Sequence, residues 1–422
     1  MRQLVATPCI LSLCLFLSSL EGAEKPEQAL DGLIDKLKAS PSSLTAVLGE
    51  YNRIESADRF DLFGRHHIHQ GLLKQVKSLK APEVARAAAA AFRDSSRTMF
   101  PSQVLLMKAL LSPDFPAPRK ERVDWLLKLA KDKDARRSGW GVHILAESRW
   151  PEAIDGLIDL LKKEEVANPQ GLLVSVIGAD LYHVLGVAGR GTSFEIEKNW
   201  NDLGKKAPAK PDHGTGRATG VTVVFFGDRV SPFSAFAIDT SSSMLEKATL
   251  RQHGSGGTTG VKGQETSGPK TPKVDIVKQE LTRVVGGLQS HCKFNILGYN
   301  ASYVPWRNGR GGLRLHAAST SVIESASEFV RGLRVAQGTN IHDTMVAALG
   351  IPEVETIYLL SDGVPSRGGG PAEIERRVAA MNYLSGIRIV TYGFTPEGGG
   401  SFDEAFMRRL ALENWGWYRR LN

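Results

Sequence analysis

The spacing of hydrophobic residues changes once along the chain, near residue 206. From Lys25 to about Lys206 apolar residues recur at helical spacing, and strand-like patterns are nearly absent. Beyond this point short apolar runs of strand length alternate with helical patterns. A chain of 422 residues also exceeds what one hydrophobic core usually serves. The pattern therefore predicts an N-terminal α-helical domain over 24–205 and an α/β domain over 220–422.

Similar sequences recur within the helical part. DGLIDKLK at 31–38 returns as DGLIDLLK at 155–162, and each follows a Pro-Glu pair that suits the first turn of a helix. VDWLLKLAKD at 123–132 is a looser copy, and APEVARAAAAAFRD at 81–94 predicts another amphipathic helix. Because one helix pair cannot cover its own apolar face, neighbouring pairs must stack. The segment over roughly 27–205 resembles a HEAT-type or armadillo-like helical array, and an ordinary helical bundle is the alternative.

Strands are expected after a linker at 206–219, which is rich in Pro, Gly and Lys. The strand-like runs are VTVVFFG (221–227), SAFAID (234–239), KFNILGY (293–299), TIYLLSDG (356–363) and IRIVTYGF (387–394). Helical patterns lie between most of them, at 273–288, 321–333, 342–350 and 373–384. Such alternation predicts a doubly wound, mostly parallel sheet that helices cover on both faces.

The first 23 residues have the pattern of a secretory signal peptide. A single cation at Arg2 precedes an uncharged run from Leu4 to Leu20, and small residues follow before Glu24. The alternative is a membrane anchor, which needs a longer span without Pro8 and a cationic stop. We therefore expect an exported protein, secreted or periplasmic, without a stable membrane span, and the cleavage position stays open.

Cysteine content and charge narrow the function classes. Removal of residues 1–23 leaves Cys292 alone, so no intramolecular disulfide can form, and its strand-like surroundings indicate a small buried hydrophobe. The formal charge of +8 is scattered among acidic residues, without a dense basic run or interleaved aromatic residues. Nucleic-acid binding is therefore not expected.

Polar side chains follow two of the predicted strands. In SAFAIDTSSSM, residues 234–244, an apolar run ends at Asp239 and four hydroxyl-bearing residues come next. Asp362 stands at the end of the run at 356–363. Ligands of such sheets bind beyond the carboxyl ends of the strands, so we expect Asp239 and Asp362 to meet at one edge.

These residues complete a known pattern. DTSSS (239–243) supplies Asp239, Ser241 and Ser243 as Asp-x-Ser-x-Ser, GTN (338–340) supplies Thr339, and SDG (361–363) supplies Asp362. The part over about 220–422 resembles the von Willebrand factor type A domain, and these five side chains match its metal-ion-dependent adhesion site position by position. The resemblance implies a Rossmann-like, doubly wound sheet with a divalent cation at its top.

The chemistry of these donors agrees with a hard cation. Mg²⁺ takes about six oxygen ligands, and the motif contains no His or thiolate that would favour Zn²⁺. By the resemblance Ser241, Ser243 and Thr339 touch Mg²⁺ or Mn²⁺ through neutral hydroxyls, while Asp239 and Asp362 act directly or through water. Neutral donors leave the ion short of negative charge, which favours an Asp or Glu carboxylate of a partner protein. The alternative, that Asp239 and Ser241 cap the next helix, does not account for the other two elements.

Three further stretches stand out. The Gly, Ser and Thr-rich insertion at 245–272 has two open interpretations, a loop that contributes to ligand choice or covers the site, and disordered filler. GRHHIHQG brings His66, His67 and His69 together in what we interpret as an exposed helical patch. WGWY at 415–418 is expected to end the last helix and start an edge strand, with its aromatic residues in the core or at its rim.

The sequence therefore favours an exported, metal-dependent protein-binding or adhesion protein whose helical array offers a second interaction surface. One alternative is a metal-assisted hydrolase that uses the same cation, but the sequence offers no nucleophile and base pair, nucleotide-binding loop or convincing second metal site. The other is a structural scaffold whose site is empty. We expect a protein that is not an enzyme.

Overall fold

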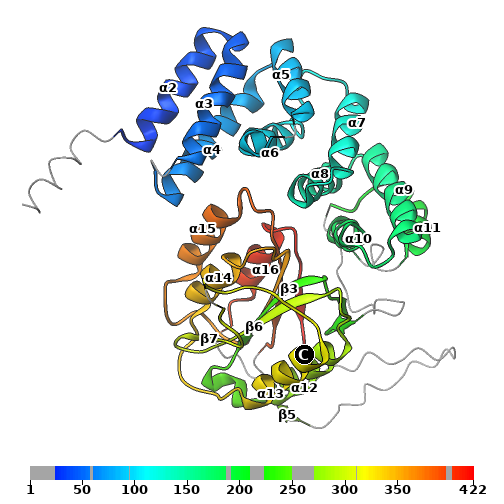
Figure 1. Cartoon of the computed structure of the whole chain (residues 1–422), viewed down its shortest axis with the longest axis vertical. Coiled ribbons are helices and arrows are strands. Elements are labelled where there is room, and N and C mark those ends of the chain that lie inside the picture. Colours follow the sequence, from blue (N-terminus) through cyan, green and yellow to red (C-terminus); the bar gives the residue numbers. More distant parts are fainter. Residues whose placement is uncertain are drawn as a thin grey trace, which may run out of the picture. The chain divides into compact units, whose positions relative to one another are not determined.

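A computed structural model describes residues 24–57, 60–94, 96–186, 192–209, 223–249, 270–309, 311–395 and 402–422. The expected signal peptide, most of the expected linker and most of the 245–272 insertion lie outside these ranges. Within the described ranges, no helix combines the length and the apolar character that crossing a membrane requires. The chain divides into an N-terminal unit, Met1–Ala117, and a C-terminal unit, Pro118–Asn422, and each is described by itself (Figure 1).

The N-terminal unit is helical. Its elements are α2 (Pro26–Ala39), η1 (Pro41–Ser43), α3 (Leu44–Ser56), α4 (Leu62–Ser78), α5 (Pro82–Arg93), η2 (Arg97–Met99) and α6 (Phe100–Ala109). Proline occupies the first turn of α2 and α5, as the sequence predicts. Leu33, Val47 and Leu72 are completely buried between these helices. The helices expected at 31–38 and 81–94 are therefore confirmed.

The expectation of an exposed histidine patch on α4 is wrong for one of its members. His69 is completely buried, and its Nδ1 lies 2.6 Å from the hydroxyl of Tyr51. His67 is exposed and His66 is half-buried. His69 precedes the buried Leu72 and Leu73 by three and four residues, and this helical spacing places it on the inner face of α4.

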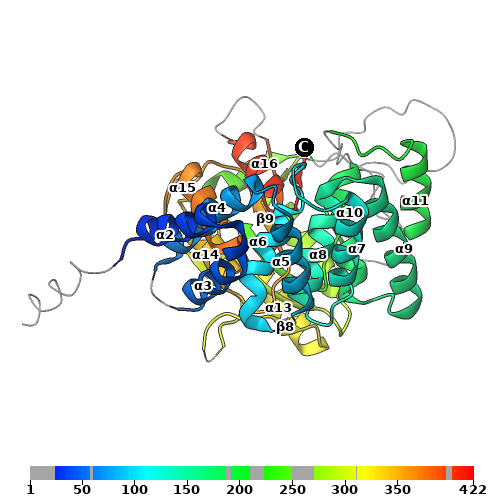
Figure 2. The ribbon, with the colours of Figure 1, turned by 90° about the horizontal axis from the view of Figure 1, so that it is seen from above.

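Five helices open the C-terminal unit: α7 (Arg119–Ala130), α8 (Ala135–Ser148), α9 (Pro151–Ala167), α10 (Leu172–Leu185) and α11 (Ser193–Asp202). α7 and α8 lie side by side (Figures 1 and 2). The helices expected around 123–132 and 155–162 are present, whereas a HEAT-like repeat relation among them stays a prediction. The sequence assigns these helices to one domain over 24–205, but the chain divides between Ala117 and Pro118, and the five helices belong with the sheet.

Seven strands form the main sheet: β3 (Phe233–Asp239), β6 (Lys293–Tyr299), β7 (Tyr303–Pro305), β8 (His316–Ala317), β9 (Thr356–Ser361), β10 (Arg388–Gly393) and β11 (Tyr418–Arg420). Their order is β11-β10-β9-β3-β6-β7, with β8 also paired to β6. The five strands from β11 to β6 run parallel, whereas β7 and β8 are antiparallel to β6. The predicted α/β architecture, helices followed by a mostly parallel doubly wound sheet, is confirmed.

The described part of the first expected strand, residues 223–227 of 221–227, does not join this sheet. This part forms β1 (Val224–Phe225), which pairs only with β2 (Asp228–Arg229) in an antiparallel ribbon. Phe226 and Gly227 both take positive φ angles, 47° and 89°, and reverse the chain between the two strands. The apolar run therefore breaks at a tight turn instead of continuing as a sheet strand.

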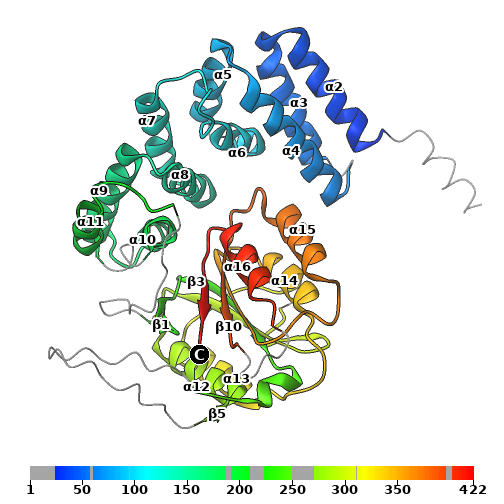
Figure 3. The same ribbon diagram turned by 180° about the vertical axis from the view of Figure 1, so that it is seen from behind.

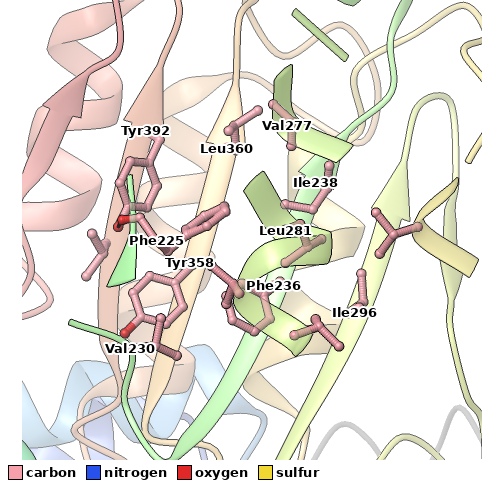
Figure 4. Close-up of a cluster of buried hydrophobic side chains, with 14 of the residues drawn as sticks. Phe225, Val230, Phe236, Ile238, Val277, Leu281, Ile296, Tyr358, Leu360 and Tyr392 are labelled. Carbon is pink, nitrogen blue, oxygen red and sulfur yellow. Dashed lines mark hydrogen bonds between the residues drawn. The ribbon is translucent and has the colours of Figure 1, made fainter. Parts of the chain in front are cut away.

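Helices cover both faces of the sheet, which gives two apolar layers. α12 (Lys273–Gly287) and α13 (Thr320–Gly332) lie on one face, and α14 (Ile341–Leu349), α15 (Pro371–Asn382) and α16 (Glu404–Leu412) lie on the other (Figures 1 and 3). Alternate residues of β3 serve the two layers: Phe236 and Ile238 face α12, while Ala235 and Ala237 face α14. Figure 4 shows Phe236, Ile238 and Ile296 of the first layer with Val277 and Leu281 of α12. Cys292 belongs to this layer and is buried, as expected.

The connections place a switch point beside β3. From β3 the chain passes through α12 to β6 on one side, and it later enters β9 on the other side of β3. Two adjacent parallel strands whose connections run in opposite directions leave a crevice at their carboxyl ends, which is where open α/β sheets bind ligands. The carboxyl ends of β3 and β9 are therefore the place to look for a site.

Candidate metal site at the switch point of the sheet

Both predicted carboxylates lie at this switch point. Asp239 is the last residue of β3, Asp362 directly follows β9, and Ile238 pairs with Leu360 in the register of the two strands. Asp239 is completely buried and Asp362 is 2% exposed. Buried carboxylates need partners. The site supplies hydroxyls for this purpose.

A chain of hydrogen bonds links the two aspartates through the serines. The backbone N–H of Ser241 donates to Oδ1 of Asp239 at 2.7 Å, and the hydroxyls of Ser241 and Ser243 are 3.0 Å apart. The hydroxyl of Ser243 then donates to Oδ1 of Asp362 at 2.6 Å. The helix-capping alternative has little support, because the element that follows is the short 3₁₀ turn η4 (Ser242–Leu245) and the side chain of Ser241 makes no cap hydrogen bond to it.

Thr339 reaches the same place from the loop before α14. Its Oγ1 and the Oγ of Ser243 each lie 3.8 Å from the position that a Cβ on Gly363 would occupy. Gly338 permits this approach with a φ of +94°, at a point where a Cβ would meet the backbone of Ala301 at 3.0 Å. The Oγ of Ser366 accepts a hydrogen bond from the Thr339 N–H at 2.9 Å and holds the loop. The structure thus brings all five predicted site residues together.

The charges of the site favour a cation. Burial, followed by the nearby charge of Asp362, raises the pKa of Asp239 to about 7, although hydrogen bonds from Ser241 and Ser361 act in the opposite direction. Ser361 donates to Oδ2 of Asp239 at 2.7 Å. The raised pKa means that the charged form of Asp239 is disfavoured by its surroundings, and a positive charge beside the carboxylate would favour that form.

One positive charge that we did not expect from the sequence is already there. Lys273, the first residue of α12, is 2% exposed, and its Nζ donates to Oδ2 of Asp362 at 2.8 Å and to Oε2 of Glu246 at 2.7 Å. Burial alone would lower the pKa of Lys273, but the hydrogen bonds with Asp362 and Glu246 raise it above the ordinary value. Only its place at the start of a predicted helix marks Lys273 in the sequence, and that position does not indicate a partner.

The donor set fits a hard divalent cation. Three hydroxyls and two carboxylates converge, and oxygen donors of this kind suit Mg²⁺ or Mn²⁺. Within the part of the chain that the structure describes, no three His, Cys, Asp or Glu side chains form a group able to hold a metal ion. A cation here therefore depends on the hydroxyls of Ser241, Ser243 and Thr339. Ser243 is half-buried, and the neighbouring Leu245 is 58% exposed, so this side of the site borders solvent.

Comparisons with known proteins give partial similarities. No family model matches the chain. A segment of 163 residues is 26% identical to inter-alpha-trypsin inhibitor heavy chain H4 of Bos taurus and covers 35% of this chain and 17% of that protein. The Homo sapiens protein of the same name is 27% identical over 164 residues, with coverage of 36% and 16%. A third match, 27% over 104 residues, is to von Willebrand factor A domain-containing protein 3B of Homo sapiens and covers 24% of this chain and 8% of that protein.

Two solved structures are also similar at low identity. A von Willebrand factor type A protein from Catenulispora acidiphila is 16% identical with a TM-score of 0.35, over 46% of this chain and 39% of its own. Proximal thread matrix protein 1 from the mussel byssus is 14% identical with a TM-score of 0.30, over 45% and 41%. The sequence matches, in particular the one to a protein named for its von Willebrand factor A domain, support the resemblance stated from the motif.

Proposed function

We propose that this protein is an exported protein-binding module that captures a carboxylate of a partner protein through a divalent cation, Mg²⁺ or Mn²⁺. The observation that carries the proposal is the convergence of five oxygen-bearing side chains at the switch point of the sheet, where Ser243 links to Asp362 and to Ser241. Export is inferred from residues 1–23. The helices α2 to α6 are proposed as a second interaction surface.

Each side chain of the site has a separate task in this proposal. The hydroxyls of Ser241, Ser243 and Thr339 would hold the ion, and Asp239 and Asp362 would act directly or through water. A bound Mg²⁺ or Mn²⁺ would supply a Lewis-acidic coordination position for a carboxylate oxygen of the partner. Because the hydroxyls are neutral, they hold the ion without cancelling its charge. An Asp or Glu side chain is the donor that best supplies the missing negative charge.

Mg²⁺ is expected to raise the melting temperature of the wild-type protein above its value in EDTA, and substitution of Asp239 by Asn is expected to abolish this increment. An ion that binds only the folded state stabilises it by mass action, by about 2.7 kcal/mol when its concentration is 100 times Kd. Asp239→Asn keeps the size of the side chain and removes its charge from the site. Differential scanning calorimetry with EDTA, Mg²⁺ and Mn²⁺ measures the effect.

The matched control is Asp275→Asn, which removes an exposed carboxylate from the first turn of α12. This variant should keep the full Mg²⁺ increment, because Asp275 is not part of the site. An equal increment in wild type and Asp239→Asn would contradict metal binding at this place. Turnover of a simple phosphate or ester substrate that disappears in Asp239→Asn would favour the hydrolase alternative instead.

A further inference from the structure

A buried ion pair joins the candidate metal site to the base of the insertion. Lys273 and Asp362 have side chains that are 2% and 0% exposed, and their charged groups are 2.8 Å apart. The second carboxylate on Lys273, that of Glu246, is 60% exposed, so solvent screens it far more strongly. The charge of Lys273 therefore acts mainly on Asp362.

The local structure leaves Lys273 little freedom. β4 (Lys247–Ala248) and β5 (Thr271–Pro272) form an antiparallel ribbon in which Lys247 pairs with Pro272, and α12 begins at the next residue. The N–H of Lys273 donates to the carbonyl of Glu246 at 3.0 Å. On the other side α12 is held against the sheet by Val277 and Leu281 (Figure 4). The position of the ammonium is thus set by the β4·β5 ribbon and by the packed helix α12.

Both oxygens of Asp362 are engaged in this arrangement. Oδ2 accepts from Lys273, and Oδ1 accepts from the hydroxyl of Ser243, which lies beside Ser241. The proton of Ser243 points to Asp362, so a lone pair of the Ser243 hydroxyl is left for the ion. Asp362 therefore orients the hydroxyl of Ser243, and each of its two oxygens accepts a hydrogen bond. Partners of this kind, one step removed from the ion, orient metal ligands in many proteins.

The same ion pair decides the net charge of the site. Asp239 and Asp362 contribute two negative charges when ionised, and Lys273 cancels one of them. With Lys273 in place, the divalent ion, the two carboxylates and the ammonium together carry one net positive charge. Without it the two carboxylates would neutralise the ion and remove its attraction for a third. Folding stability alone does not account for a buried lysine here, because well-packed apolar residues can often replace a buried ion pair without loss of unfolding free energy.

We propose that Lys273 is a positioning and charge-setting residue of the metal site: its ammonium keeps Asp362 one step away from the ion and preserves the positive charge that attracts a partner carboxylate. This inference rests on the proposed function. In this role Lys273 favours binding of an acidic partner at the expense of tight cation binding. Lys273 is expected to weaken cation binding and to strengthen carboxylate binding.

The test measures Mg²⁺ alone, by isothermal titration calorimetry on the full chain. Lys273→Met is expected to bind Mg²⁺ about tenfold more tightly than wild type, because loss of a short-range positive charge outweighs loss of one orienting hydrogen bond. Its melting temperature in EDTA should fall, since Asp362 loses its counter-charge. The double variant Lys273→Met/Asp362→Asn removes both charges and should return to within about threefold of the wild-type affinity, as an interacting pair requires.

Lys278→Met is the matched control on the same helix. Lys278 donates to the backbone carbonyls of Arg331 and Leu333 and contacts no carboxylate of the site in the described residues. This variant should keep wild-type Mg²⁺ affinity. Should Lys273→Met fail to fold in EDTA, the double variant, which contains no unpaired buried charge at this position, still tests whether the pair sets the affinity.

A second measurement separates the partner from the ion. The probe is acetyl-aspartate amide, which is added to the Mn²⁺-loaded protein. Its binding is measured as a decrease in the water-proton relaxation rate, because a carboxylate that binds Mn²⁺ displaces water from the ion. Lys273→Met is expected to bind the probe at least about fivefold more weakly, because the net positive charge has gone. Equal or weaker Mg²⁺ binding by Lys273→Met together with unchanged probe binding overturns the role of Lys273 alone. A wild-type protein that binds neither Mg²⁺ nor Mn²⁺ overturns the proposed function and, with it, this inference.

Discussion

Replacing Asp180 with Ala is expected to lower the free energy of unfolding of the C-terminal unit by about 3 to 5 kcal/mol. Asp180 lies on α10 and is 1% exposed, and its Oδ1 accepts from Nη2 of Arg388 at 2.7 Å. Its Oδ2 lies 2.6 Å from Nδ1 of His143 on α8. Burial alone would raise the pKa of Asp180, but His143 and Arg388 hold it below the ordinary value. The substitution leaves a buried guanidinium without its carboxylate.

The size of this effect follows from where the three residues lie. Arg388 is the first residue of β10 and is 3% exposed, and its Nη1 donates to the carbonyl of Trp415. The Nε2 of His143 lies 3.1 Å from the carbonyl of Gly386. Two helices are thus attached to the start of β10 by polar contacts that water cannot replace. Loss of the central carboxylate weakens both attachments at once.

Urea unfolding followed by tryptophan fluorescence measures the change. Asp159→Ala is the matched control, because Asp159 is an exposed α9 carboxylate, 69% accessible, that is paired with Lys162 at 3.9 Å. It should change the free energy of unfolding by less than about 0.5 kcal/mol. Similar losses in the two variants would show that the buried network does not hold the helices to the sheet.

This network also shows why the boundary between the two units was not predictable. Periodicity identifies α8 and α10 as helices, but it says nothing about which distant strand a buried polar residue on them contacts. His143 and Asp180 contact Gly386 and Arg388, more than 200 positions away in the sequence. Pro and Gly residues at 205–216 indicate a linker, and such a composition is compatible with helices that return to pack on the domain after it.

The strands that carry the site were predictable for a physical reason. β3, β6, β9 and β10 are buried on both faces, so each appears in the sequence as a mostly apolar run, and the runs of β3 and β9 end at polar residues. The ends of β3 and β9 therefore locate Asp239 and Asp362 within one residue. Lys273 was not predictable in its role, because its contact with Asp362 depends on the β4·β5 ribbon, whose two strands have only two residues each.

Gly416→Ala is expected to cost more than about 4 kcal/mol of unfolding free energy, a loss that few single substitutions reach. Gly416 is buried between α16 and β11, and a Cβ at this position would lie 1.7 Å from the carbonyl oxygen of Ile389 in β10. No side-chain rotation relieves this contact, because the Cβ is fixed by the backbone of residue 416 and the carbonyl oxygen is part of the backbone of Ile389. The segment before β11 must therefore move away from β10.

Such a movement breaks several contacts together. The N–H of Gly416 donates to the carbonyl of Ala411, and its own carbonyl lies 2.8 Å from Nδ1 of His183 on α10. The next residue, Trp417, is 4% exposed, which agrees with a core role for the aromatic residues of 415–418. β10 pairs with β9, the strand that leads into Asp362. Displacement of β11 thus exposes the edge of β10, the direct neighbour of the strand that leads into the candidate metal site.

Gly286→Ala provides the comparison, since a Cβ at Gly286 meets nothing within 4 Å and the residue is exposed near the end of α12. Alanine replaces glycine in a helix there, so this variant is expected to gain up to about 1 kcal/mol. Calorimetric melting of the two variants in parallel separates steric exclusion from a general effect of glycine replacement. Equal stability of Gly416→Ala and Gly286→Ala would mean that the segment before β11 adjusts freely, and that the tight approach of Gly416 to β10 is not needed to hold the sheet edge.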